Sequence, residues 1–171
     1  KVVNFGIIYG VSAFGLSNQT NLSRAESKAI IENYYKSYPQ LKDFTNDQVE
    51  FARENGYVKT ILGRKRFLND INSRNAILRS SAERNAINTP VQGSAADIIK
   101  IAMVKINNEF QNQSIKSKLI LQVHDELIFD CLKDELNIVK EIITSNMQSA
   151  YKLKVPLKVD IGQGNNWLEA H

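Results

Sequence analysis

Apolar residues recur along most of the chain at the three- and four-residue spacing of an amphipathic helix, and capping residues mark where these segments begin and end. The residues Ser-Arg-Ala-Glu at 23–26 form a capping box, which favours a helix start. Pro39 is a favoured first residue of a helix, and Gly56 is a favoured residue just past its end. Spacing and caps together predict helices over about residues 24–37, 39–55, 72–88, 91–112 and 136–152.

Shorter apolar runs bounded by turn residues predict the strands. Residues 57–68 have the pattern of a hairpin with a basic turn, and residues 119–130 that of a second hairpin. Residues 155–162 alternate apolar and polar positions, so a third strand is expected beside the second hairpin. Helices followed by strands favour an α+β fold with a small antiparallel sheet packed against helices. The expected division separates a helical portion, 1–88, from a sheet-bearing portion, 89–171.

Composition narrows the class of protein. The 171 residues, 43% of them apolar, suffice for one domain or two small lobes. No apolar run has the length of a transmembrane helix, and no signal peptide is recognisable. The single cysteine, Cys131, favours a cytoplasmic location, and with two histidines it is too few for a structural zinc site. The net charge of +4 mildly indicates a polyanionic partner. A start at Lys1, directly in apolar sequence, is typical of a piece of a longer protein.

Adjacent carboxylates, Asp125 and Glu126, lie between the two apolar runs of the second hairpin, in a turn that lacks the glycine of ordinary tight turns. Two neighbouring carboxylates repel each other, and both are costly to bury without a counter-charge. A rigid, exposed acidic turn suits Mg²⁺, which prefers oxygen ligands. The alternative is a merely solvated turn, which the acid pair alone does not exclude.

Three other groups carry candidate chemistry. Lys1, Phe5 and Tyr9 are four residues apart and lie within about 80° of one another on a helix, so one cation and two rings share a face. That face suits a phosphate and a base, or it is a buried aromatic stripe with a lysine at its edge.

A polar group follows at Arg84, Asn88 and Gln92, which are also four residues apart, although Pro90 is expected to end or kink their helix. Arginine and amide side chains can contact phosphates and minor-groove edges. A solvated polar face is the alternative.

The basic turn of the first hairpin contains Arg64, Lys65 and Arg66, which suit a phosphate backbone. A charged loop tip that serves only solubility is the alternative. Each of these signals is modest by itself.

Four segments in this order closely resemble the C-terminal part of bacterial family A DNA polymerases: KVVNFGIIYG, ERNAINTPVQGSAAD, LQVHDELIFD and GQGNNWLEAH. The resemblance covers essentially the whole chain. It implies a DNA-directed DNA polymerase, a nucleotidyltransferase of DNA replication and repair, with primer-template DNA and deoxynucleoside triphosphates as partners. It also implies that residues 1–88 are mainly fingers helices with the basic hairpin, and that residues 89–171 belong to the palm.

The resemblance further implies a role for each candidate residue. Lys1 would contact the triphosphate of the incoming nucleotide, Phe5 would pack on its sugar and base, and Tyr9 would lie next to the templating position. The residues expected to contact DNA are Arg84, Asn88, Gln92 and His124, together with the basic turn. Asp125 would be the second catalytic aspartate and would hold Mg²⁺, of which the complete polymerase would bind two ions, and Glu126 would be a secondary catalytic residue.

The chain also departs from the family pattern. A second catalytic aspartate, in a block like Asp-Tyr-Ser-Gln-Ile-Glu, and an arginine one helical turn before Lys1 are both absent. The 171 residues alone are therefore expected to be inactive as a polymerase. A metal-dependent nuclease using Asp125 and Glu126, and a non-catalytic nucleic-acid-binding module, are the alternatives. The sequence leaves the oligomeric state open.

Overall fold

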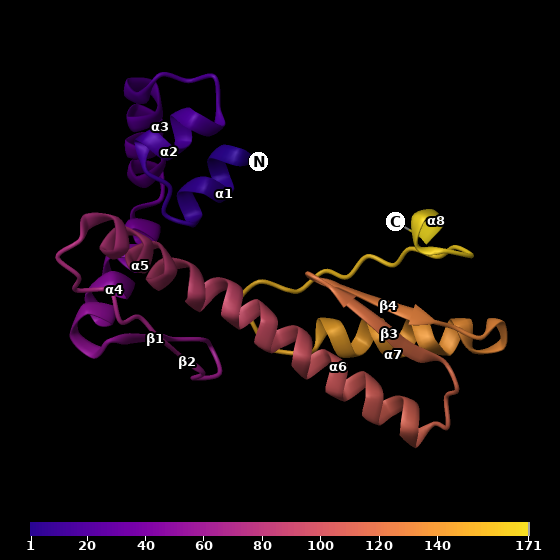
Figure 1. Cartoon of the computed structure of the whole chain (residues 1–171). Helices are drawn as coiled ribbons and strands as arrows, with labels where there is room; N and C mark the ends of the chain where they lie inside the picture. Colours follow the sequence, from indigo (N-terminus) through magenta and orange to yellow (C-terminus); the bar gives the residue numbers. More distant parts are fainter. Residues whose placement is uncertain (171) are drawn as a thin grey trace. The chain divides into compact units, whose positions relative to one another are not determined.

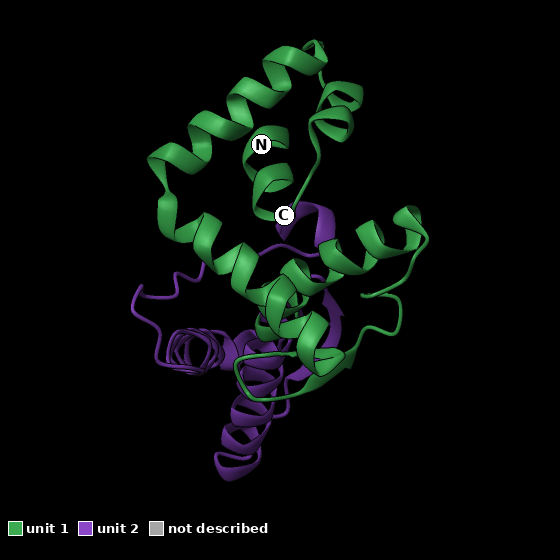
Figure 2. Cartoon of the chain, turned by 90° about the vertical axis from the view of Figure 1, so that its left-hand side faces the viewer, with its two compact units in different colours: residues 1–94 green, residues 95–171 purple. Residues whose placement is uncertain are grey.

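The computed structural model describes residues 1–170 and divides the chain into unit 1, Lys1–Ser94, and unit 2, which begins at Ala95 (Figures 1 and 2). Unit 1 contains α1 (Val2–Ile8), α2 (Ala13–Gln19), α3 (Arg24–Ser37), α4 (Pro39–Asn55), β1 (Tyr57–Lys59), β2 (Lys65–Phe67), α5 (Ala76–Asn88) and the π-helix η1 (Thr89–Gly93). α6 (Ser94–Asn112) begins at its last residue. Unit 2 continues with β3 (Lys118–Val123), β4 (Glu126–Asp130), the 3₁₀ turn η2 (Lys133–Glu135), α7 (Leu136–Gln148) and α8 (Trp167–Ala170).

The caps of α3 and α4 confirm the helix boundaries predicted from sequence. The Ser23 hydroxyl accepts a hydrogen bond from the Glu26 amide, and the Glu26 carboxylate accepts one from the Ser23 amide, so the capping box is complete. α4 begins at Pro39, and Gly56 follows it in the left-handed region at φ 76°. These boundaries depend on local interactions, which a sequence pattern can predict.

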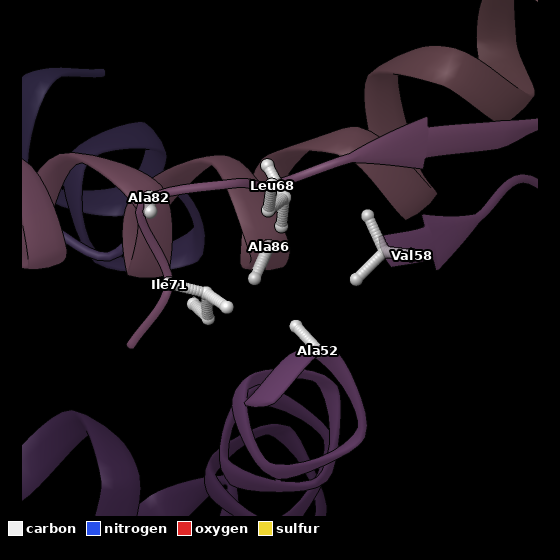
Figure 3. Close-up of a cluster of buried hydrophobic side chains, with 6 residues drawn as sticks. All are labelled: Ala52, Val58, Leu68, Ile71, Ala82 and Ala86. Carbon is white, nitrogen blue, oxygen red and sulfur yellow. The ribbon is translucent and has the colours of Figure 1, made fainter. Parts of the chain in front are cut away.

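The core of unit 1 is small and rich in alanine. Ala52 of α4, and Ala82 and Ala86 of α5, are buried against the hairpin residue Val58 and against Leu68 and Ile71 (Figure 3). Short side chains let α4, α5 and the β1–β2 hairpin approach closely, so the position of the hairpin is fixed by packing.

The helical run around Pro90 differs from its prediction. α5 begins at Ala76 rather than near residue 72, because the Asn75 side chain caps it by accepting hydrogen bonds from the Ile77 and Leu78 amides. The turn at Pro90 is widened into a π-helix, and the Ser94 hydroxyl donates to the Pro90 carbonyl. Proline has no N–H and its ring crowds the preceding turn, which a wider turn accommodates.

Unit 2 has its own core, formed by α6, α7 and the β3–β4 hairpin. Ile106 and Phe110 of α6 pack on Val139, Ile142 and Ile143 of α7, and half-buried hairpin residues cover the same cluster. The ring of Phe129 lies 6.0 Å from that of Phe110. The hairpin is therefore held against two helices and its tip projects from a packed base.

The predicted strand at residues 155–162 is wrong, because this segment has no strand partner among residues 1–170. Within residues 1–170, β3 and β4 pair only with each other, so the sheet predicted to have three strands has two, while β1 and β2 form the other predicted hairpin. Leu157 and Val159 are half-buried, as the alternation suggested, but periodicity alone does not supply a partner strand. α7 also ends at Gln148, four residues short of the predicted end at 152. No helix within residues 1–170 is long and apolar enough to cross a membrane.

Glu135 ties η2 to the loop that leads into β3. Its carboxylate accepts hydrogen bonds from the Ser117 hydroxyl at 2.6 Å, the Ser117 amide at 2.8 Å and the Lys116 amide at 2.9 Å. The hydrogen bond from the Ser117 hydroxyl, followed by that from the Lys116 amide, lowers the pKa of Glu135 from its ordinary value. The ionised side chain therefore joins the two ends of the β3–β4 hairpin region.

Because the pKa of Glu135 is lower in the folded chain, its stabilising effect is present above the unfolded-state pKa and is lost as the pH falls through the folded-state value. We expect Glu135→Gln to lower the free energy of unfolding at pH 7 and to reduce its further loss on acidification below about pH 4.5. Urea unfolding of both chains at pH 7 and pH 3, followed by circular dichroism, measures this. Glu141→Gln, at an exposed position on α7, is the control. Equal acid sensitivity of Glu135→Gln and the parent chain would contradict the assignment.

Candidate nucleotide and nucleic-acid site

Two sequence-predicted groups that lie about 80 residues apart in the chain meet in unit 1. Phe5 and Gly6 of α1, with Tyr9 after it, and Arg84 and Asn88 of α5 line one open cleft of about 480 Å³. The rings of Phe5 and Tyr9 are stacked, with centroids 6.3 Å apart and planes at 15°. Phe5 is 53% exposed, so this face of α1 is not a buried aromatic stripe.

The cleft combines planar apolar groups with a cation and amides. The side-chain oxygen Oδ1 of Asn88 is buried without a hydrogen-bond partner among residues 1–170. An unsatisfied buried carbonyl oxygen costs about 1–3 kcal/mol of stability. Lys1 and Gln92 were predicted to act with this group, but neither is among the residues that line the cleft.

The turn between α1 and α2 approaches α5 closely at Gly10. Gly10 has φ +74°, a conformation that L-residues rarely adopt, and a Cβ there would lie 3.0 Å from Cδ1 of Ile87. Gly6 is also confined, because a Cβ would lie 3.1 Å from Cγ1 of Val11. The wall of the cleft formed by α1 therefore depends on glycine at its base.

We expect Gly10→Ala to lower the free energy of unfolding by more than Gly56→Ala. Both glycines have φ near +75°, which costs an L-residue about 1–2 kcal/mol, but nothing lies within 4 Å of a Cβ at Gly56. The difference between the two variants in urea unfolding measures the contact with α5. Equal losses would mean that Ile87 can move away from the added Cβ without a loss of stability.

The basic residues predicted to form a turn lie partly in a strand: Arg64 is in the turn, but Lys65 and Arg66 are the first two residues of β2. Arg64 and Arg66 brace η1 rather than extending freely. Arg66 donates from Nη1 to the Thr89 hydroxyl at 3.2 Å, and Arg64 donates from Nη2 to the Gly93 carbonyl at 3.2 Å. The Ile61 amide donates to the Ser94 hydroxyl at 2.8 Å. A Cβ on Gly93 would lie 2.6 Å from Cγ2 of Thr60 in the structure as it stands, so the approach of the hairpin requires glycine there. We call the hydrogen bonds of Arg64 and Arg66 to η1 the bracket. The sequence did not predict the bracket, because nothing in its pattern pairs residues 61–66 with residues 89–94.

If Arg66 holds η1 through Thr89, Arg66→Ala should accelerate amide hydrogen exchange in residues 89–93. A net contribution of about 0.5–1.5 kcal/mol for one hydrogen bond corresponds to roughly a two- to twelve-fold change. Arg66→Lys should restore part of the protection, since lysine donates without the planar geometry of arginine. Lys65→Ala is the matched control, because the Lys65 ammonium lies 4.3 Å over the Tyr57 ring instead. Unchanged exchange in Arg66→Ala would show that packing alone holds η1.

The second candidate group lies in unit 2, at the tip of the β3–β4 hairpin. His124 and Asp125 connect the strands, and Glu126 is the first residue of β4, paired with Val123. His124 adopts φ 52°, which is how the turn closes without a glycine. Gln122 donates from Nε2 to the His124 carbonyl at 3.1 Å. Asp125 is exposed and Glu126 is half-buried.

Asp125 and Glu126 provide the hard oxygen donors that a divalent cation such as Mg²⁺ prefers. Within residues 1–170, however, no three His, Cys, Asp or Glu side chains are grouped so that they could hold a metal. The donor chemistry fits one side of a metal site, and the described residues do not complete it. No step of a reaction can be assigned to a metal held by these residues alone.

The chain is similar to known DNA polymerases over nearly its whole length. The chain is 48% identical over 169 residues to DNA polymerase I of Caldicellulosiruptor bescii, which covers 99% of this chain and 20% of that protein. It is 47% identical over 171 residues to DNA polymerase I of Borreliella burgdorferi, which covers 100% and 19%. A solved POL domain of Pol1 from M. smegmatis, in complex with DNA primer-template and dNTP, superposes with a TM-score of 0.94 at 41% identity, over 98% of this chain and 30% of that one.

The sequence matches DNA polymerase family A over residues 1–169, and the chain belongs to that family. This confirms the resemblance and the α+β fold class predicted from the sequence. The chain spans about a fifth of the length of the curated relatives it matches.

Proposed function

We propose that this chain is the nucleotide- and primer-contacting part of a template-directed DNA polymerase, which adds deoxynucleotides to a primer 3′ end. The cleft of unit 1 carries the proposal, because it brings stacked rings together with an arginine and an amide in a member of this family. The likeness to a POL domain that holds DNA primer-template and dNTP supports it.

The cleft residues would bind and orient the nucleotide and the template. The exposed Phe5 ring offers a plane for the sugar and base of the incoming nucleotide, and Tyr9, stacked on it, would border the templating base. Lys1, at the start of α1, would contact the triphosphate as a point charge. Holding the reacting groups in line is the main contribution of protein to phosphoryl transfer.

The polar residues after Ala82 would contact the primer-template. Arg84 would pair with a phosphate, and Asn88, which lines the same cleft, would contact the minor-groove edge of a base pair. Gln92 lies in η1 and would contact the same duplex. The bracket formed by Arg64 and Arg66 would set the position of Gln92, in addition to any contact of the basic turn with DNA.

At the hairpin tip, His124 would lie by the primer terminus, Asp125 would be the catalytic ligand, and Glu126 would act in a secondary catalytic role. A bound divalent metal, for which we propose Mg²⁺, would supply Lewis-acid stabilisation of phosphate charge. The chain spans a fifth of its relatives, so further ligands would come from other parts of a longer polymerase. We place the reaction in DNA replication and repair in the cytoplasm of a bacterium, because the relatives are bacterial polymerases.

The two alternatives fare differently. A nuclease that uses Asp125 and Glu126 is disfavoured by the match over residues 1–169 to DNA polymerase family A. A non-catalytic binding module describes what we expect of the 171 residues in isolation: binding of nucleic acid without extension of a primer.

A chimera tests the function. The matching 171-residue segment of the Borreliella burgdorferi polymerase is replaced by this chain, to which it is 47% identical. We expect the chimera to extend a primer on a template, and Asp125→Ala to lower the rate at least about 100-fold, since metal stabilisation of the transition state is worth several kcal/mol. The Kd for primer-template, measured by fluorescence anisotropy, should change by no more than about three-fold.

Asp130→Ala is the matched control, because Asp130 is an exposed aspartate at the far end of the same hairpin. It should extend primers like the parent chimera. Normal extension by Asp125→Ala would remove Asp125 from the catalytic site. A folded chimera that binds primer-template but never extends it would contradict the proposed function of the chain.

A further inference from the structure

One face of the β1–β2 hairpin is used neither by the core nor by the cleft. The strand register pairs Tyr57 with Phe67 and Lys59 with Lys65. Side chains alternate between the two faces of a strand, so these four residues share a face, which we name the outer face. The opposite face carries the buried Val58 and Arg66, which braces η1.

The aromatic side chains of the outer face pack on one another but remain exposed to solvent. The rings of Tyr57 and Phe67 meet edge to face, with centroids 5.9 Å apart and planes at 63°. Phe51 of α4 supports Tyr57 from behind, at 5.7 Å and 83°. Phe67 itself is 69% exposed. A cross-strand pair formed only to stabilise the hairpin does not need a ring that presents most of its surface to water.

The other half of the outer face is cationic. The Lys65 ammonium lies 4.3 Å and the Lys59 ammonium 5.5 Å from the centre of the Tyr57 ring. Neither lysine forms an ion pair within residues 1–170. Residues 57–68 include four basic residues and no acidic one. Positive charge is thus held beside an exposed ring by cation–π contacts, which leave the ammonium groups able to meet an anion.

We propose that the outer face binds single-stranded DNA, with a base stacked on Phe67 and phosphates on Lys59 and Lys65. Aromatic planes alternating with cations are the chemistry by which proteins hold single strands without reading sequence. In a duplex each base face is covered by its neighbours, so an exposed ring favours an unpaired strand. An acidic peptide would satisfy the lysines but would make no use of the ring. The proposal goes beyond the polymerase function, because the outer face shares no residue with the cleft and only Lys65 with the basic residues expected to contact DNA.

A local fluorescence reporter tests occupancy of the outer face directly. The chain has one tryptophan, Trp167, so Phe67→Trp in a Trp167→Phe background places the only indole on the face. We expect an oligodeoxythymidine of about sixteen nucleotides to quench its emission, and neither an equally long duplex nor polyglutamate to do so at the same concentration. Ile77→Trp in the same background, at an 80% exposed position on α5, is the control and should not be quenched.

The affinity of the 171-residue chain for single-stranded DNA then measures the contributions of the aromatic and the cationic residues separately. Phe67→Ala should weaken single-strand binding about ten-fold, which lies within the range for loss of one stacked base. The double variant Lys59→Gln/Lys65→Gln should reduce the slope of log affinity against log salt by about 1.4, at roughly 0.7 per neutralised phosphate. Ile77→Ala and Lys42→Gln, at exposed positions elsewhere in unit 1, should change neither quantity.

Three results would overturn the proposal: quenching by polyglutamate or duplex equal to that by single strand, a Phe67→Ala affinity within two-fold of the parent, or an unchanged salt slope in the lysine variant. None of these measurements needs primer extension. Failure of the outer face and failure of the polymerase function can therefore be told apart.

Discussion

The passage of the helical backbone through Pro90 is the constraint on which the candidate site of unit 1 depends. A proline inside a helix removes one hydrogen bond and crowds the turn before it. The chain keeps a helical course there by widening one turn into η1, and the β1–β2 hairpin holds the widened turn through Arg64 and Arg66. The hairpin is fixed in turn by Val58 and Leu68 in the alanine-rich core. A basic turn that could have served only solubility thus has a structural task.

The sequence predicted features that depend on neighbouring residues, and it did not predict those that depend on residues far apart in the chain. The capping box at residues 23–26 and the glycine after α4 involve neighbours in the chain, and both boundaries were predicted correctly. The hydrogen bonds that hold η1 join residues that are 23 and 29 positions apart, and no periodicity reports such a pairing. The strand expected at 155–162 failed for a related reason, since a strand requires a partner as well as an alternating pattern.

The candidate site shows the same limit. Spacing placed Phe5 with Tyr9, and Arg84 with Asn88, on two helical faces, but only the fold shows that these faces line one cleft. Lys1 and Gln92, which spacing assigned to the same faces, lie outside its lining. The tip of the β3–β4 hairpin belongs to the other unit, with a core of its own. The stacked rings of the cleft and the carboxylates of the hairpin tip therefore lie in separately packed parts of the chain.

The left-handed backbone conformation of His124 lowers the stability of the fold, while it allows a histidine side chain at the hairpin tip. A residue with a Cβ in the left-handed region is less stable there than glycine by about 1 kcal/mol. Selection for thermal stability alone would favour glycine at the first position of this turn. Histidine at this position is advantageous only if the function of its imidazole outweighs the lost stability. A heat-adapted version of the chain would then keep His124 and gain stability at other positions.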